Sequence, residues 1–193
     1  MLNEAFWDNR YINNDTGWDM KQVSPPLKSI IDSLNDKHLK ILIPGCGNAY
    51  EAASLALQGF TNVTLIDIAP TLINRLKKQF SDSNIQIVLG DFFDHQGGYD
   101  LILEQTFFCA LNPKLRPDYV HKCFELLNQS GSLRGVLFNI NFENDGPPFG
   151  GTQSEYESLF SPSFYLEHID ICQNSIEKRQ GNELLINFKT TKK

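Results

Sequence analysis

The stretch from Ile41 to Asp67 constrains the fold of this chain more than any other part of the sequence. Its first apolar run predicts a buried strand, which breaks into a glycine turn at 44–48 and is followed by a helical pattern over 49–58. A second apolar run over 63–66 predicts another strand and ends on Asp67. This order of strand, glycine turn, helix, strand and acidic residue predicts a nucleotide-type cofactor site at the strand ends.

The residues of the turn narrow the choice of cofactor. Glycine lets the backbone turn sharply and approach a ligand that a Cβ would exclude, so we expect Gly45 and Gly47 to contact the cofactor. Asp67 is placed to accept hydrogen bonds from both ribose hydroxyls. The third glycine of the dinucleotide pattern G-x-G-x-x-G is replaced by Tyr50, which argues against a diphosphate. S-adenosylmethionine fits these residues, and a nicotinamide dinucleotide or a purely structural turn are the alternatives.

The composition limits the partners of the chain. At 193 residues it has the length of one domain, 1–193, with its own core. The net charge of −6 and the lack of a basic stripe argue against nucleic acid. No apolar run suits a membrane span and no signal-peptide pattern is seen, so we expect a cytoplasmic protein with a small-molecule substrate. The scattered cysteines and histidines show no metal-ligand spacing, and nothing indicates an oligomeric state.

Strand and helix patterns alternate through the middle of the chain. Pro25 and Pro26 open a first helical stretch. Strands are predicted at 39–44, 63–67, 85–88, 100–104 and 132–140, and helices at 49–58, 70–80, 114–128 and 152–160. This alternation predicts an α/β fold with a mostly parallel sheet, helices on both faces and ligands beyond the carboxyl ends of the strands.

The end of the chain departs from that alternation. Strand patterns at 165–171 and 183–188 are joined by a turn-prone segment with no helical pattern between them. Two strands connected in this way should pair antiparallel. A parallel sheet closed by an antiparallel hairpin resembles the Rossmann-like, seven-stranded fold of class I methyltransferases. A nicotinamide-binding domain usually keeps its last strand parallel, so the tail favours methyl transfer.

A family resemblance rests on several motifs. Residues 6–19, FWDNRYINNDTGWD, resemble the opening of the thiopurine S-methyltransferase family, which includes thiol and halide methyltransferases. Further matches are PGCG at 44–47, DFFD at 91–94, EQTFFCALNP at 104–113 and GPPFGG at 146–151. The resemblance covers nearly the whole chain and implies S-adenosylmethionine as cofactor.

The resemblance also implies a role for the aromatic residues near the N-terminus. Trp7, Tyr11 and Trp18 match an aromatic lid, formed by residues 1–22, that closes over the methionine part of the cofactor. Aromatic faces attract a sulfonium cation and exclude water from it. A hydrophobic cover over the sheet edge would explain the same residues by packing alone.

Three residues after the third and fourth strands match further cofactor contacts of the family. Asp91 and Phe92 match the pair that flanks the adenine, although Asp91 could instead cap a turn. Gln105 stands where relatives have an arginine or a tyrosine. Its amide can donate to the methionine carboxylate but brings no charge, so a thiopurine acceptor is not assumed.

The expected acceptor is a small soft nucleophile. Phe6, Phe107, Phe108 and Phe149 suggest an apolar pocket that desolvates it, although each could equally be core packing. Arg116 could attract an anion, or could be an exposed or capping arginine. A thiolate, halide or thiocyanate needs no general base, and no catalytic residue is assigned. We therefore predict an S-methyltransferase, with a nicotinamide-dependent oxidoreductase or a non-catalytic adenosine-binding module as alternatives.

Overall fold

The structure is a computed structural model that describes residues 2–192. The helices are α1 (Glu4–Ile12), α2 (Pro25–Asp32), α3 (Tyr50–Leu57), α4 (Pro70–Gln79), α5 (Arg116–Leu126) and α6 (Gln153–Phe160). The strands are β1 (Ile41–Pro44), β2 (Val63–Asp67), β3 (Gln86–Leu89), β4 (Tyr99–Gln105), β5 (Leu127–Phe138), β6 (Phe164–Ile171) and β7 (Glu183–Thr190). The 3-10 turns are η1 (Phe92–Asp94), η2 (Phe108–Ala110), η3 (Pro113–Leu115) and η4 (Glu177–Arg179). No helix within residues 2–192 is long and apolar enough to cross a membrane.

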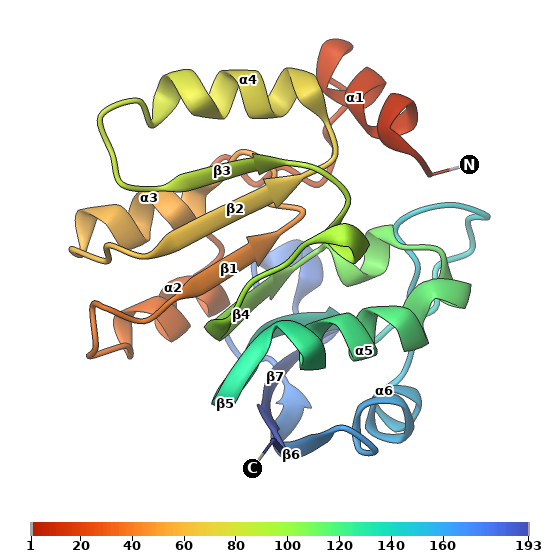
Figure 1. The fold of residues 1–193 in the computed structure, drawn as a ribbon. Helices are drawn as coiled ribbons and strands as arrows, with labels where there is room; N and C mark the ends of the chain where they lie inside the picture. The colour runs from red at the N-terminus through yellow and green to blue at the C-terminus, as the bar shows by residue number, and fades with distance from the viewer. Residues whose placement is uncertain (1, 193) are drawn as a thin grey trace.

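The strands form one sheet in the order β3-β2-β1-β4-β5-β7-β6 (Figure 1). β1 to β5 pair in parallel, and β7 pairs antiparallel with both β5 and β6. The predicted parallel sheet with an antiparallel C-terminal hairpin is therefore confirmed. The strand order reverses between β1 and β4, and ligands of such sheets bind beyond the carboxyl ends of the strands at this switch.

Helices cover both faces of the sheet, and each face has its own core (Figure 1). Because successive residues of a strand point to opposite faces, Ile41 and Ile43 enter one core and Leu42 enters the other. The first core contains apolar residues of α2, α3 and α4, and the second contains those of α5 and α6. The central parallel strands β1, β2 and β4 are buried on both faces, which explains their continuous apolar runs, whereas the edge strand β3 is only partly covered.

The structure differs from the sequence prediction in two places. The segment before the first strand contains α1, whose N-terminus is capped by Asn3: its side chain accepts a hydrogen bond from the Phe6 amide. β5 begins at Leu127, five residues before the predicted 132, because Leu127 already pairs with Tyr99 ahead of an irregularity in the ladder. Ser130 adopts a φ of 63° inside this irregularity, so residues that favour turns interrupt the strand without ending it.

Candidate active site

A cavity of about 430 Å³ lies at the carboxyl ends of β1, β2 and β4. Ten of the residues predicted for the site line it: Trp7, Tyr11, Trp18, Gly45, Gly47, Asp67, Asp91, Phe92, Gln105 and Phe107. The volume falls in the range of about 300–1,000 Å³ that is usual for small-molecule sites. The fold thus brings together residues from the N-terminal segment and from the ends of four strands.

The glycine turn after β1 has the backbone that its sequence predicts. Gly45 and Gly47 have φ values of 54° and 50°, a left-handed conformation that favours glycine. A Cβ at Gly45 would lie 2.3 Å from Cδ2 of Phe107, whereas a Cβ at Gly47 would have its nearest neighbour, the Tyr11 hydroxyl, at 3.8 Å. Gly45 therefore allows an aromatic ring to close over the turn, and Gly47 leaves open space above the backbone.

Asp67 ends β2 and faces the cavity with a mostly buried carboxylate, since the residue is 9% exposed. Its Oδ1 accepts a hydrogen bond from the Ala69 amide at 3.0 Å, and its Oδ2 accepts a long one from the Gly47 amide at 3.5 Å. Burial raises the pKa of this carboxyl to about 6. A carboxylate held in this way can still accept hydrogen bonds from a ligand's hydroxyl groups.

Gln105 ends β4 with one half of its side-chain amide unpaired. Ser24 donates a hydrogen bond from Oγ to Oε1 of Gln105 at 2.6 Å, which fixes the orientation of the amide. The Nε2 atom is buried and has no hydrogen-bond partner within residues 2–192. A buried N–H without a partner costs about 1–3 kcal/mol, so a ligand acceptor that reached this donor, such as a carboxylate, would remove that cost.

Asp91 and Phe92 lie on the opposite flank of the glycine turn, after β3. Asp91 caps η1 by accepting a hydrogen bond from the Phe93 amide at 2.9 Å, so the capping role considered for it is present. Phe92 is 4% exposed, and its ring packs edge-on against Phe107 with centroids 5.3 Å apart. These rings form an apolar surface beside the cavity.

The three aromatic residues of the N-terminal segment pack against each other over the cavity. Trp18 makes edge-to-face contacts with Trp7 and Tyr11, at centroid distances of 5.7 and 5.9 Å. Tyr11 is only 8% exposed and belongs to the core on the α4 side of the sheet, and Arg75 of α4 lies over its ring. The segment is thus anchored to the sheet domain in this structure.

A second anchor joins α1 to the N-terminus of α4, which lies beside it (Figure 1). The Asp8 carboxylate accepts hydrogen bonds from the amide and the hydroxyl of Thr71, at 2.7 and 3.1 Å. The N-cap residue of α4 is Ala69, whose side chain cannot accept a hydrogen bond. Asp8 therefore supplies to α4 the cap that its own sequence lacks.

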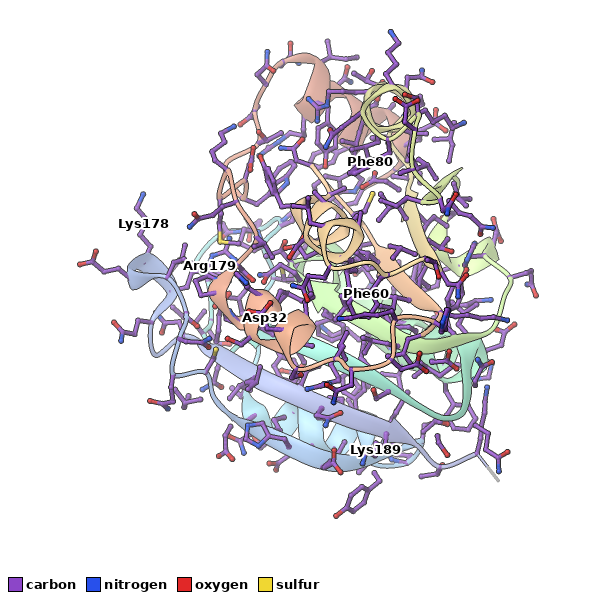
Figure 2. The ribbon with its side chains drawn as sticks, turned by 90° about the vertical axis from the view of Figure 1, so that its left-hand side faces the viewer. Asp32, Phe60, Phe80, Lys178, Arg179 and Lys189 are labelled. Carbon is purple, nitrogen blue, oxygen red and sulfur yellow. The ribbon has the colours of Figure 1, made fainter. Side chains whose placement is uncertain are left out.

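Sequence reasoning missed Arg179, the last residue of η4, which also lines the cavity. Its guanidinium donates to Glu183 at 3.2 Å and to the carbonyl of Trp18 at 3.4 Å, and lies 5.3 Å from the centre of the Phe138 ring. Lys178 points into solvent, whereas Arg179 turns toward the N-terminal segment (Figure 2). The predicted antiparallel hairpin could have indicated this position of Arg179, because the turn that precedes β7 must return to the carboxyl ends of the parallel strands.

Glu104 is a second residue that the sequence did not single out. Its fully buried carboxylate accepts hydrogen bonds from the amides of Phe107 and Phe108, at 2.8 and 2.9 Å, and from the hydroxyl of Tyr119 at 2.6 Å. Burial raises its pKa to about 7. The turn that it holds includes Thr106, whose φ of 60° is unusual for a residue other than glycine.

Four of the residues predicted for the acceptor site do not line the cavity that residues 2–192 form: Phe6, Phe108, Arg116 and Phe149. Phe6 packs edge-on against Trp7, and Phe108 is a core residue that is 1% exposed. Arg116 is 5% exposed, so the alternative of an exposed arginine is wrong. The packing alternative therefore describes Phe108, and Phe107 is the one phenylalanine predicted for the acceptor site that lines the cavity.

Comparison with solved structures identifies the class of fold. The chain matches 1,6-didemethyltoxoflavin-N1-methyltransferase from Burkholderia thailandensis with a TM-score of 0.78, at 17% identity over 98% of this chain and 87% of that one. That structure holds S-adenosylhomocysteine. The fold is therefore that of the class I methyltransferases.

Sequence comparison then gives the family. The family model for thiopurine S-methyltransferase matches residues 2–189, so the chain belongs to the thiopurine S-methyltransferase family. Probable thiol methyltransferase 2 of Arabidopsis thaliana is 30% identical over 95% of this chain and 84% of its own length. Thiocyanate methyltransferase 1 of Brassica oleracea is 28% identical over 97% and 86%. The family is one of S-adenosylmethionine-dependent S-methyltransferases, which decides against the nicotinamide alternative.

Proposed function

We propose that this protein transfers the methyl group of S-adenosylmethionine to a small, soft sulfur nucleophile in the cavity at the strand ends. The observation that carries the proposal is that one cavity collects a left-handed glycine turn, a buried carboxylate and a buried unpaired amide. Gly45 and Gly47 would let the cofactor approach the backbone, Asp67 would accept from the ribose hydroxyls, and Gln105 Nε2 would donate to the methionine carboxylate. These residues form what we call the cofactor side.

The remaining wall is called the acceptor side. It is formed by residues of the 105–111 turn other than Gln105, together with Phe138, Pro147-Pro148 and Arg179. Phe107 and the two prolines would keep water away from the reacting atoms. Arg179 brings a positive charge to the same wall, and a guanidinium attracts an anionic acceptor such as a thiolate. The aromatic rings of Trp7 and Trp18 would stabilise the sulfonium by roughly 0.5–2 kcal/mol each.

The proposed methyl transfer requires no acid or base from the protein when the acceptor is an anion. When bound, S-adenosylmethionine supplies an electrophilic methyl group on a positively charged sulfur. A lone pair of the acceptor sulfur forms the new carbon–sulfur bond, while the electron pair of the old bond goes to the departing sulfur and leaves a neutral thioether. The cavity walls align the two partners at about 3–3.5 Å, and no residue has to remove a proton from an acceptor that is already an anion.

The test is methyl transfer from cofactor labelled on the methyl group to a panel of acceptors: thiophenol, a small aliphatic thiol, thiocyanate and iodide. We expect label on at least one sulfur acceptor, and at least about fivefold less when Asp67→Asn is assayed at a cofactor concentration near the wild-type KM, because its cofactor binding should be about tenfold weaker. Binding of S-adenosylhomocysteine without transfer to any acceptor would contradict catalysis and favour the binding-module alternative.

The pH profile separates a thiol acceptor from a halide. Without an enzymic base, thiol turnover should rise toward the pKa of the free thiol, about 8.5 for a cysteine-like thiol. Iodide carries its charge at every pH, so its methylation should lack that rise. Matching profiles for the two acceptors would instead indicate an ionising group on the protein.

We also propose that residues 1–22 act as a lid and that the enzyme is cytoplasmic. The lid is supported by Trp7 and Trp18, which line the cavity from a segment whose residues 12–15 are exposed. The four unpaired cysteines support a reducing compartment. S-adenosylhomocysteine should change the tryptophan fluorescence and slow proteolysis of this segment. If the ligand has neither effect, the tryptophans are a permanent hydrophobic cover and the segment is not a lid.

A further inference from the structure

We infer that Arg116, which lies outside the cavity, is a positioning residue that holds the Pro147-Pro148 wall in place and so determines how the acceptor is bound. The inference rests on the proposed function, because it concerns the acceptor side of the same cavity. It assigns to Arg116 a role different from the anion contact that the sequence suggested.

Arg116 begins α5 and is almost completely buried. Its Nη2 donates to the carbonyl oxygen of Gly150 at 2.6 Å, and its Nη1 forms an ion pair with Glu155 of α6. The guanidinium lies over the rings of Phe108 and Tyr156, 5.0 and 5.9 Å from their centres. The two polar contacts and the two aromatic rings together fix the orientation of the planar guanidinium, with Nη2 directed at the Gly150 carbonyl.

Gly150 lies at the base of the loop that joins β5 to α6. The Gly151 amide donates to the carbonyl of Ile140 at 3.0 Å and closes the base of the loop. The Phe149 amide donates to the carbonyl of Cys109 at 2.7 Å. Three successive residues, 149 to 151, are thus fixed, and Pro148 immediately before them lines the cavity.

The position of Gly150 has little freedom to shift. A Cβ there would lie 1.7 Å from the Ile140 carbonyl oxygen, so the two chain segments pass in direct contact. Arg116 holds the outer side of this crossing, and without it the Gly150 carbonyl would lose a charge-assisted hydrogen bond in a partly buried position. The wall at Pro147-Pro148 would then be held by the Phe149 and Gly151 bonds and by the long hydrogen bond, 3.4 Å, that the Asn144 amide donates to the Pro148 carbonyl within the loop.

The experiment compares Arg116→Met with three variants. Glu155→Gln removes the ion pair but leaves the Gly150 bond, Arg116→Lys keeps the cation, and Phe164→Leu destabilises the core at β6, away from the cavity. A displaced wall should lower kcat/KM for the best acceptor at least about tenfold in Arg116→Met, since small misplacements of bound reactants have effects of this size. Affinity for S-adenosylhomocysteine should stay within about twofold of wild type. Arg116→Lys should recover part of the loss, and Glu155→Gln and Phe164→Leu should show little of it.

A second readout, hydrogen exchange, needs no activity. In Arg116→Met the amides of Phe149 and Gly151 should exchange faster relative to those of β1, while Phe164→Leu should leave that ratio unchanged. The inference is overturned if these amides keep their protection, if Phe164→Leu lowers acceptor kcat/KM equally, or if cofactor affinity falls in step with it. If the wild type methylates no acceptor, the proposed function fails, and hydrogen exchange still decides whether Arg116 holds the loop.

Discussion

The cofactor side of the cavity is formed by the ends of the parallel strands themselves, whereas the acceptor side is formed by turns that buried charged side chains hold in place. Gly45 follows β1 directly and Asp67 is the last residue of β2, so their positions are set by the hydrogen-bonded ladder. The acceptor side depends on Glu104 under the 105–111 turn and on Arg116 beside Gly150. Substitutions on the cofactor side should therefore act through backbone and cofactor affinity, and those on the acceptor side through the acceptor.

The largest effect should come from adding a methyl group to the glycine turn. Gly45→Ala and Gly47→Ala carry the same backbone cost, roughly 1–2 kcal/mol, because both residues have a left-handed φ. Gly45→Ala also forces the Phe107 ring to move, which adds about 1–3 kcal/mol of overpacking. Urea unfolding of the ligand-free protein should therefore show a larger loss of unfolding free energy for Gly45→Ala.

The double variant Gly45→Ala/Phe107→Ala is the control for that comparison. Removing the ring should eliminate the extra loss, so the two substitutions should couple favourably in a double-mutant cycle. Equal destabilisation by the two single alanines would mean that Phe107 does not pack on the turn as described.

Next in size is the loss of the Asp67 charge. Asp67→Asn keeps the volume of the side chain but weakens the hydrogen bonds to the ribose, each charged bond contributing about 1.5–3 kcal/mol. Calorimetry should show that S-adenosylhomocysteine binds about tenfold or more weakly, with the fold intact by circular dichroism. Unchanged affinity would remove Asp67 from the cofactor side.

The same carboxyl predicts how cofactor binding depends on pH. Its pKa of about 6 is raised above the ordinary value, so folding favours the protonated form relative to the unfolded chain when no cofactor is bound. The stability from this group is present below its unfolded pKa and is lost as pH rises through about 6. Cofactor affinity should follow the opposite course, flat above about pH 7 and falling up to tenfold per pH unit below 6. Asp67→Asn should remove this slope; a slope that persists would belong to another group.

The smallest of these effects should come from the loss of the Arg179 charge. Arg179→Met removes the one cation contributed by η4 to the cavity wall but leaves the glycine turn and Asp67 untouched. For an anionic acceptor, kcat/KM should fall by a factor of about two to twelve, which corresponds to a loss of about 0.5–1.5 kcal/mol of transition-state stabilisation. Cofactor affinity measured by calorimetry should not change, and a parallel loss there would place Arg179 on the cofactor side.

The difference between the two sides also explains what the sequence could predict. The strand ends carry local signals, so Gly45, Gly47 and Asp67 could be found from periodicity and turn residues. Arg179 and Glu104 carry no such local signal. Arg179 is placed by the return of the C-terminal hairpin toward Trp18, and Glu104 by the turn that folds back onto its carboxylate. Arg116 shows that a local pattern can also mislead. Its sequence neighbourhood suggested an anion contact, but the packing of α5 against α6 buries the side chain. Among the helices, α1 was missed because its polar and aromatic residues lack an apolar stripe.

The cap that Asp8 supplies to α4 couples the proposed lid to the stability of a neighbouring helix. If the lid lifts, Thr71 loses its acceptors and the first turn of α4 frays, at a cost of about 1 kcal/mol for a lost cap. That amount alone favours the closed form roughly fivefold, before any cofactor is present. Opening of this segment would therefore be coupled to fraying of α4, so a ligand that keeps the segment closed would also keep the first turn of that helix ordered.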